Sequence, residues 1–429
     1  MAFRRPYHGW LVVAVCFMAA VFTWGFGVFG ASVYLSEVTR ATGWSVTLVS
    51  AAVTTFYLTN ALALTTVGAA IDRHGSRPVF IFGILALSLS VTLIGHVAEQ
   101  WQLFAAFIVL GLGYATLSLT GLSSTIAPWF DRHQGRSVAI ALMGASFGAM
   151  VIVPLTVMAI ARFGFGSAML GAGLLVAAVM LPLAIVILRY RGPAELGLAP
   201  DGGIVVAISD GPRVTPAVWT RSTAVRTVAL WTIAVGFALG LIVQIGFLTH
   251  HLKLAEPVLG LVGAGWLVSA TGLTGLIGRF VLAAIADRVN VRLWSAAIFG
   301  LQTVTLGLMG AVPDPAVLIG ASLVYGFCLG QITTLSPIVV RREFGSASYG
   351  AIYSVAATVI QLSSAFGPAL YGTLRDLFGG YGPVLAIAAG FEAAAMLTVL
   401  AGALRPLPAE PRGATRRSPL PLREGSGEG

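Results

Sequence analysis

Long apolar segments, separated by short charged turns, recur along the whole of this 429-residue chain. A helix needs about 20 apolar residues to cross the hydrocarbon core of a bilayer, and twelve segments reach that length. Only 10% of the residues are charged, against about 25% in soluble proteins, which excludes a water-soluble domain. We expect an all-α polytopic membrane protein with twelve transmembrane helices, at residues 10–34, 45–71, 78–97, 102–128, 137–161, 167–188, 227–250, 258–286, 293–312, 316–340, 349–374 and 383–404.

Basic residues lie almost entirely on one side of this predicted topology. Placing the N-terminus in the cytoplasm leaves 20 of the 25 Lys and Arg residues in cytoplasmic segments. The opposite side receives Arg40, Arg162, Lys253 and Arg375. This positive-inside bias predicts a multi-pass protein of the plasma membrane (the inner membrane of a bacterial cell), with both termini in the cytoplasm. It also accounts for the net charge of +9, so we expect no nucleic-acid partner.

The chain also divides into two similar halves. Residues 189–226 contain five Arg and four Pro and predict a cytoplasmic linker. The turns at 72–77 and 287–292 both read Asp-Arg-x-x-x-Arg and lie 215 residues apart. Two six-helix halves of this kind are typical of secondary transporters. We predict six-helix bundles in residues 1–188 and 227–405, and a disordered cytoplasmic tail in 406–429.

Arg279 is the one basic residue that lies inside a predicted span. An arginine at this depth costs about 2.5–3.5 kcal/mol on insertion scales, so it is usually retained for a partner or a ligand. Helical spacing places the small residues Ser269, Gly272 and Gly275 on its face, which leaves room for another helix or a small anion. With the boundaries above, none of the first six spans contains Asp or Glu. We expect Arg279 to bind an anionic substrate; an ion pair with Glu392 and snorkelling toward the cytoplasm remain alternatives.

Charged residues at the cytoplasmic helix ends predict a conformational latch. A carboxylate at a helix end can pair with an arginine of a neighbouring helix in one transport state and release it in the other. The alternative is that these arginines only anchor the topology. The predicted latch residues are Asp72, Arg73, Arg77, Asp131, Arg132, Arg136, Asp287, Arg288 and Arg292.

Several polar side chains interrupt the apolar spans and could either donate to a substrate or hold helices together. These candidate binding residues are Tyr114, Gln244, Tyr325, Gln331 and Gln361. Glu392 lies near the middle of the last span, where desolvation favours its neutral form; it could carry a coupled proton or be a peripheral structural residue. His250 and His251 are expected at the membrane interface, and no cluster of Cys or acidic residues accompanies them for a metal.

The repeated turn resembles the signature of the major facilitator superfamily. Its G-x-x-x-D-R-x-G-R-[RK] motif stands here as GAAIDRHGSR at residues 68–77, with Ser76 at the first basic position. Segments at 8–10 (HGW), 43–44 (GW), 129–137 (WFDRHQGRS) and 366–376 (FGPALYGTLRD) resemble the monocarboxylate and oxalate–formate branch. The resemblance implies the major facilitator fold, a substrate-binding arginine matching Arg279 and a cavity tyrosine matching Tyr114. Gly275 replaces an acid that eukaryotic members often carry, and the first span lacks their lysine. The resemblance therefore supports an organic anion more than their form of proton coupling.

These observations predict a monomeric secondary transporter of a small, monocarboxylate-like anion that works by alternating access, with a co-transported proton left open. The alternative within transport is an exporter of drugs or other amphipathic metabolites, which would favour an acid within the first bundle. A transporter-like sensor would carry a signalling domain, and an enzyme would show a catalytic constellation. No nucleotide-binding motif stands out, and we expect neither a cofactor nor a metal.

Overall fold

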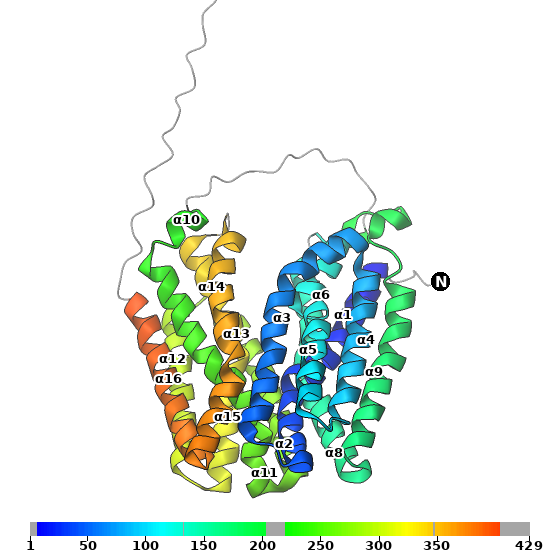
Figure 1. The fold of residues 1–429 in the computed structure, drawn as a ribbon. Coiled ribbons are helices and arrows are strands. Elements are labelled where there is room, and N and C mark those ends of the chain that lie inside the picture. The colour runs from blue at the N-terminus through cyan, green and yellow to red at the C-terminus, as the bar shows by residue number, and fades with distance from the viewer. Residues whose placement is uncertain (1–6, 132, 203–218, 346–347, 404–429) are drawn as a thin grey trace, which may run out of the picture.

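The computed structural model describes residues 7–131, 133–202, 219–345 and 348–403. Its helices form two bundles that lie side by side (Figure 1), as the predicted fold class requires. The N-terminal bundle contains α1 (His8–Thr23), η1 (Trp24–Phe29), α2 (Gly30–Thr42), α3 (Val46–His74), α4 (Ser76–Ile94), α5 (Gln100–Thr116), α6 (Leu119–Ile126), η2 (Ala127–Trp129), α7 (Gln134–Phe147), η3 (Gly148–Ile152), α8 (Val153–Phe163) and α9 (Phe165–Ile187). The C-terminal bundle contains α11 (Val228–Ile285), α12 (Val291–Ala311), α13 (Pro315–Phe344), α14 (Tyr349–Ala365), α15 (Gly367–Phe378) and α16 (Tyr381–Ala403). Between them lie the short helices η4 (Pro193–Leu196), η5 (Pro200–Gly202) and α10 (Arg221–Ala224).

Eleven helices in the described residues are long and apolar enough to span a membrane. One of them, α11, has 58 residues and contains both the seventh and the eighth predicted spans. A helix rises about 1.5 Å per residue, so an unbroken helix of this length would far exceed the bilayer core. The chain reverses at Gly260, whose φ of 66° and ψ of 169° are not helical. Because α11 supplies two spans, the described helices fit the predicted twelve.

The first span is longer than the sequence predicted. Its helical segments run without a break over His8–Thr42, although the prediction ended at residue 34. The predicted end marks the onset of polar residues, but the helix continues because Glu37 pairs with Arg40 less than one turn later. Glu37 is only 1% exposed. The prediction that the first six spans contain no acid is therefore wrong.

Glycines allow α11 and α13 to pack with their backbones in contact. A Cβ atom on Gly330 would lie 1.8 Å from the carbonyl oxygen of Gly275, and one on Gly278 would lie 2.1 Å from that of Phe327. Neither distance leaves room for a side chain. This close approach brings the backbone of α13 within reach of Arg279, the residue after Gly278.

The two bundles meet at one end and separate toward the other (Figure 1). Helix α10, from the connection between the bundles, lies at the separated end, which we call the linker end; the opposite end is the far end. Near the far end α3 packs against α15, and α2 packs against α11. The molecule is thus closed between its bundles at the far end.

Candidate functional site

Arg279 makes its hydrogen bonds to both bundles. Its Nε donates to the carbonyl oxygen of Gly330 at 3.3 Å, within the C-terminal bundle. Its Nη1 donates to the hydroxyl of Ser146 at 2.9 Å, on helix α7 of the N-terminal bundle. The guanidinium therefore lies where the two bundles face each other, which is where a transporter of this architecture needs a substrate contact.

Ser146 was not among the predicted site residues. It lies between Gly144 and Gly148, a pair of small residues that the sequence explains by helix packing alone. One sign of its role was available, because a hydroxyl inside an apolar span is a polar group that needs a partner. The sequence could not show that the partner would come from the other bundle.

Glu392 and Arg279 are not brought together. Glu392 is fully buried on α16, near Tyr325, Cys328 and Tyr371. Neither of its carboxylate oxygens has a hydrogen-bond partner in the described residues. The ion pair between Arg279 and Glu392, which we considered as an alternative, does not form among the described residues. Glu392 instead belongs to a buried polar group inside the C-terminal bundle, in which the hydroxyls of Tyr325 and Tyr371 also lack described partners.

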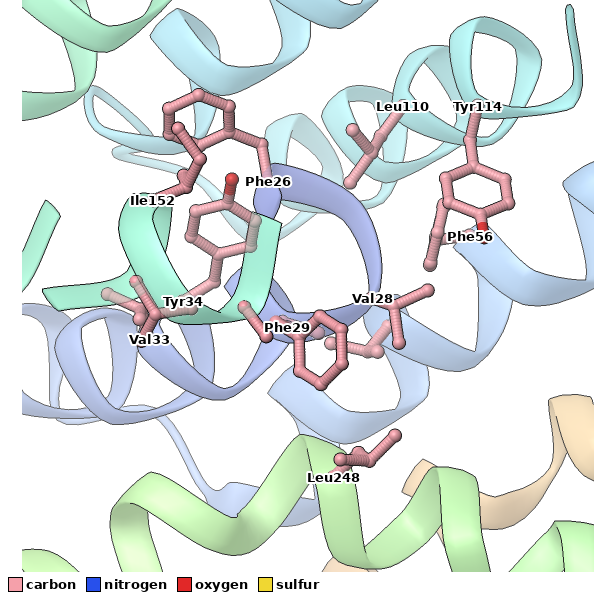
Figure 2. Packing of buried hydrophobic residues seen from close by; sticks show 14 of the residues in the cluster. Phe26, Val28, Phe29, Val33, Tyr34, Phe56, Leu110, Tyr114, Ile152 and Leu248 are labelled. Atoms are coloured by element: carbon pink, nitrogen blue, oxygen red, sulfur yellow. The ribbon is translucent and has the colours of Figure 1, made fainter. Parts of the chain in front are cut away.

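Tyr114 belongs to an aromatic cluster of the N-terminal bundle. Figure 2 shows its ring beside Phe56, and their centroids are 5.3 Å apart with the planes nearly perpendicular. The ring centroid of Trp24, from the π-helical turn η1, lies 5.4 Å from that of Tyr114. The ring also fills the space beside Gly27, where a Cβ atom would approach it to 2.7 Å. Tyr114 is thus packed against the irregular turn of the first span.

The three predicted glutamines have different surroundings. Gln331 accepts a hydrogen bond from Trp294 Nε1 at 2.8 Å, which links α13 to α12, and it directly follows Gly330. Gln244 is 2% exposed, and its carbonyl oxygen lacks a partner among the described residues. Gln361 is exposed on α14. Of the three, only Gln331 lies next to the contacts of Arg279.

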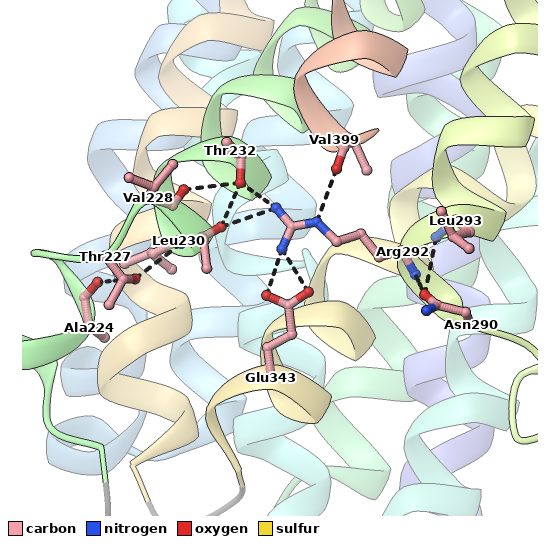
Figure 3. A network of polar contacts seen from close by, with 11 residues as sticks. Ala224, Thr227, Val228, Leu230, Thr232, Asn290, Arg292, Leu293, Glu343 and Val399 are labelled. Carbon is pink, nitrogen blue, oxygen red and sulfur yellow. Dashed lines mark hydrogen bonds and ion pairs between the residues drawn. The ribbon is translucent and has the colours of Figure 1, made fainter. Parts of the chain in front are cut away.

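The charged residues Asp287 and Arg292 of the second copy of the repeated turn lie in different surroundings. Asp287 lies at the surface and accepts a bond from Arg342 at 2.8 Å. Arg292 instead points into the C-terminal bundle, where Figure 3 shows its guanidinium between Glu343, Thr232 and the carbonyl oxygen of Val399. Both oxygens of Glu343 lie 2.7 Å from Arg292 Nη1. Arg292 is therefore held inside one bundle, whereas Asp287 remains accessible.

The other predicted latch residues that the structure describes lie at the linker end. Asp72 and Arg73 are exposed in the last turn of α3, and Arg77 is exposed in the first turn of α4. The backbone N–H of Asp131 donates to Asp201 at 3.1 Å, so this loop is tied to the start of the linker. Arg136 and Arg288 are exposed, and Arg132 lies outside the described residues.

At the far end, charged groups of the C-terminal bundle bind hydroxyl groups of the N-terminal bundle. The Ser36 hydroxyl donates to Glu256, and Lys253 Nζ donates to the Thr39 hydroxyl at 2.7 Å. A third such contact joins α15 to the start of α3. There the backbone N–H and the hydroxyl of Thr47 both donate to Asp376 Oδ2, each at 2.8 Å.

A cavity of 480 Å³ adjoins these contacts. Arg40, Lys253 and Arg375 contribute to its lining. These are three of the four basic residues that the topology predicted on the side away from the linker. Each has an acid nearby: Glu37 for Arg40, Glu256 for Lys253 and Asp376 for Arg375.

His250 and His251, which we predicted at the membrane interface, are buried inside the protein. They are 1% and 0% exposed, because the helix that carries them packs against helices of both bundles. His250 Nε2 lies 3.1 Å from the Ser50 hydroxyl of α3 and 3.2 Å from the carbonyl oxygen of Pro368. His251 Nε2 lies 3.2 Å from the Ser322 hydroxyl. No cluster suited to a metal ion occurs in the described residues.

Similar proteins are known among curated sequences. Monocarboxylate transporter 13 from Bos taurus is 25% identical over 396 residues, covering 89% of this chain and 86% of that protein. The oxalate:formate antiporter of Oxalobacter formigenes is 24% identical over 390 residues, covering 86% and 85%. The agnestins efflux protein of Paecilomyces divaricatus is 25% identical over 325 residues, covering 72% and 68%. The predicted resemblance to the monocarboxylate and oxalate–formate branch is thus confirmed.

The fold and the family are equally clear. The crystal structure of the nucleoside transporter NupG superposes with a TM-score of 0.72 at 12% identity, covering 92% of this chain and 99% of that one. A sequence model described as the Major Facilitator Superfamily matches residues 15–368, and a second, overlapping match covers 259–425. The first match alone spans most of the chain. The protein therefore belongs to the Major Facilitator Superfamily, whose members are membrane transporters and not enzymes.

Proposed function

We propose that this chain is a secondary active transporter of a small, monocarboxylate-like organic anion that works by alternating access. Arg279 carries the proposal. It lies between the bundles, and its described partners are a hydroxyl and a backbone carbonyl, neither of which neutralises its charge. A cation at this depth is costly without a counter-ion, so an anionic substrate would stabilise the site. The relatives named for monocarboxylates and for oxalate and formate support this substrate class.

In this proposal the two ends of the molecule and Glu392 also have roles. The linker end faces the cytoplasm, as the positive-inside rule requires, in a plasma membrane crossed by a monomer. The bundles at 1–188 and 227–405 rock against each other around the substrate. In the state seen here the far end is closed, and the charged turns at Asp72 and Asp287 close the linker end in the opposite state. Glu392 is the proposed site of a co-transported proton.

Uptake into proteoliposomes tests the substrate class. Labelled lactate, pyruvate and oxalate are offered with and without a pH gradient. Arg279→Lys keeps the charge but loses the planar fork of donors that fits a carboxylate. We therefore expect kcat/KM for lactate to fall at least tenfold, which corresponds to a free-energy loss of about 1.4 kcal/mol. Arg279→Ala should abolish uptake without loss of expression. Arg162→Lys, at an arginine beside Phe163 on α8, is the matched control. Wild-type uptake by Arg279→Ala would refute the proposal.

Export of amphipathic metabolites is the second candidate. The similarity to the agnestins efflux protein favours it, as does the buried Glu37 in the first bundle. Glu37 is already paired with Arg40 near the end of its span, so it is less suited than a mid-span acid to bind a cationic substrate. A cationic dye included in the same assay separates the candidates. Dye transport that survives Arg279→Ala, with no transport of carboxylates, would favour export.

A further inference from the structure

Ser146 contributes the N-terminal bundle's side of the contact with Arg279. Its Oγ accepts from Arg279 Nη1 at 2.9 Å, and the residue is 6% exposed. The contact crosses between bundles that are far apart in sequence and that must move relative to each other in any alternating-access cycle. A buried polar contact at such a place calls for an explanation beyond packing.

Local packing holds this part of α7 and η3 between two other helices. On one side, a Cβ atom at Gly144 would lie 2.3 Å from the carbonyl oxygen of Phe17, so α7 sits directly on α1. On the other side, a Cβ atom at Gly272 of α11 would lie 2.5 Å from the Cβ of Ala149. Two residues after Ser146, the helix widens into the π-helical turn η3, a feature that is frequent at functional sites. Ser146 is therefore held against α11 by backbone packing.

The Ser146 hydroxyl can still donate one hydrogen bond. A serine hydroxyl is one donor and two acceptors, and Arg279 uses an acceptor position. Ser137, on the same helix, donates its hydrogen to the carbonyl oxygen of Gln134 at 2.9 Å. No such acceptor for the Ser146 hydrogen exists among the described residues. Among the described residues, Arg279 Nη2 also has no hydrogen-bond acceptor.

We propose that Ser146 is a substrate-contacting residue, and that one carboxylate accepts hydrogen bonds from both Arg279 and the Ser146 hydroxyl. This inference rests on the proposed function and adds to it a donor from the other bundle. The Ser146 hydrogen and the remaining N–H groups of Arg279 lie on side chains already bonded to each other, so a small carboxylate can accept from both. Bound in this way, the anion is held by both bundles. A neutral amide or alcohol would accept these bonds more weakly, because charge-assisted hydrogen bonds are about twice as strong.

Three variants of the full-length protein test this role. Ser146→Ala removes the donor, and Ser146→Thr restores a hydroxyl. Ser269→Ala is the matched control, because the Ser269 hydroxyl also crosses between the bundles, to the carbonyl oxygen of Met150 at 2.8 Å, and is equally buried. Lactate is the probe, in uptake by proteoliposomes and in thermal stabilisation of the purified protein. Lactamide is the neutral comparison.

We expect Ser146→Ala to raise the KM for lactate about tenfold or more, as the loss of a hydrogen bond to a charged group implies, and to weaken stabilisation by lactate in parallel. Ser146→Thr should recover most of the affinity, and Ser269→Ala should leave KM within about twofold. A purely structural role would instead change the maximal rate in both alanine variants and leave lactate affinity alone.

The outcomes separate this inference from the proposed function. If wild-type uptake of lactate depends on Arg279 but Ser146→Ala behaves like Ser269→Ala, the role of Ser146 is refuted and the transport function stands. If the wild-type protein neither transports nor binds lactate, pyruvate or oxalate, the proposed function and the role of Ser146 are both refuted.

Discussion

The Thr47–Asp376 contact predicts that a single hydroxyl influences how often the far end opens. Ser45 caps helix α3 by accepting from the backbone N–H of Leu48 at 3.2 Å. Asp376, from the other bundle, accepts hydrogen bonds from the backbone N–H and the hydroxyl of Thr47, which lies in the same first turn of α3. A carboxylate here also interacts favourably with the positive end of the helix dipole. Opening the far end must break this cap.

The size of this effect can be estimated from the two hydrogen bonds that Thr47 donates to Asp376. Hydrogen bonds to charged groups contribute about 1.5–3 kcal/mol each, and the half-buried position of Asp376 favours the lower end of that range. Thr47→Val removes the hydroxyl donor, keeps the shape of the side chain and leaves the backbone donor in place. A loss of about 1.5 kcal/mol corresponds to roughly a tenfold larger population with the far end open.

Labelling of a buried thiol measures this population. Ser50→Cys places a thiol at a fully buried position between the bundles, next to His250. A membrane-impermeant maleimide applied from the far side reaches it only when that end opens. We expect the labelling rate to rise about tenfold when Thr47→Val is added. The native Cys16 and Cys328 are buried, and the protein that retains Ser50 gives the background.

Thr55→Val is the matched control for this prediction. Its hydroxyl also lies on α3, but it bonds to the carbonyl oxygen of Ala51 in the same helix, at 3.1 Å. Equal labelling rates in the Thr47→Val and Thr55→Val backgrounds would refute the reasoning, because the cross-bundle bond would then contribute nothing to closure.

Two further predictions concern buried charge. Arg292→Ala should destabilise the protein by about 3–5 kcal/mol, since it leaves Glu343 buried without its partner, whereas Arg342→Ala should cost about 0–1 kcal/mol because its pair with Asp287 is exposed. Thermal unfolding in detergent measures both, and similar midpoints would contradict the assignment of Arg292 to the interior. Glu392→Gln, which fixes a neutral side chain, should flatten the pH dependence of lactate uptake; an unchanged profile would exclude Glu392 as the coupling site.

The sequence predicted the fold well because the bilayer imposes simple rules. Twelve apolar segments, the charge asymmetry and a repeated turn determine a two-bundle transporter with few alternatives. The error at the first span has a clear cause. Hydropathy registers Glu37 as polar, but it cannot register that Arg40 pairs with it and keeps the helix intact. Span boundaries therefore depend on local pairing that a composition window does not contain.

The site was only partly predictable for a related reason. Arg279 stood out because no loop, tail or helix end could account for it. Ser146 did not, because its contact with Arg279 depends on which helix of the other bundle lies opposite. Arg292 was misleading in another way: the matching Asp-Arg-x-x-x-Arg turns suggested a surface latch, yet its partner Glu343 lies 51 residues later, on α13. Sequence spacing along one helix does not reveal partners on another.

Four charged side chains that bond across the bundles share one chemical pattern that bears on function. Lys253, Glu256, Asp376 and Arg279 of the C-terminal bundle each bind a hydroxyl of the N-terminal bundle. Among the described helices of the two bundles, by contrast, each ion pair lies within one bundle, as in Arg40–Glu37 and Arg292–Glu343.

This division suits a protein whose bundles must separate. Breaking a buried ion pair leaves an uncompensated charge, at a cost of about 3–5 kcal/mol, whereas a charge bonded to a hydroxyl can exchange that partner for water. At the far end, water is the available replacement. Around Arg279, the stronger replacement for a neutral hydroxyl oxygen is an anion. A carboxylate that binds there would change the contact between the bundles at the same moment, so substrate occupancy and bundle movement would be coupled through the same guanidinium.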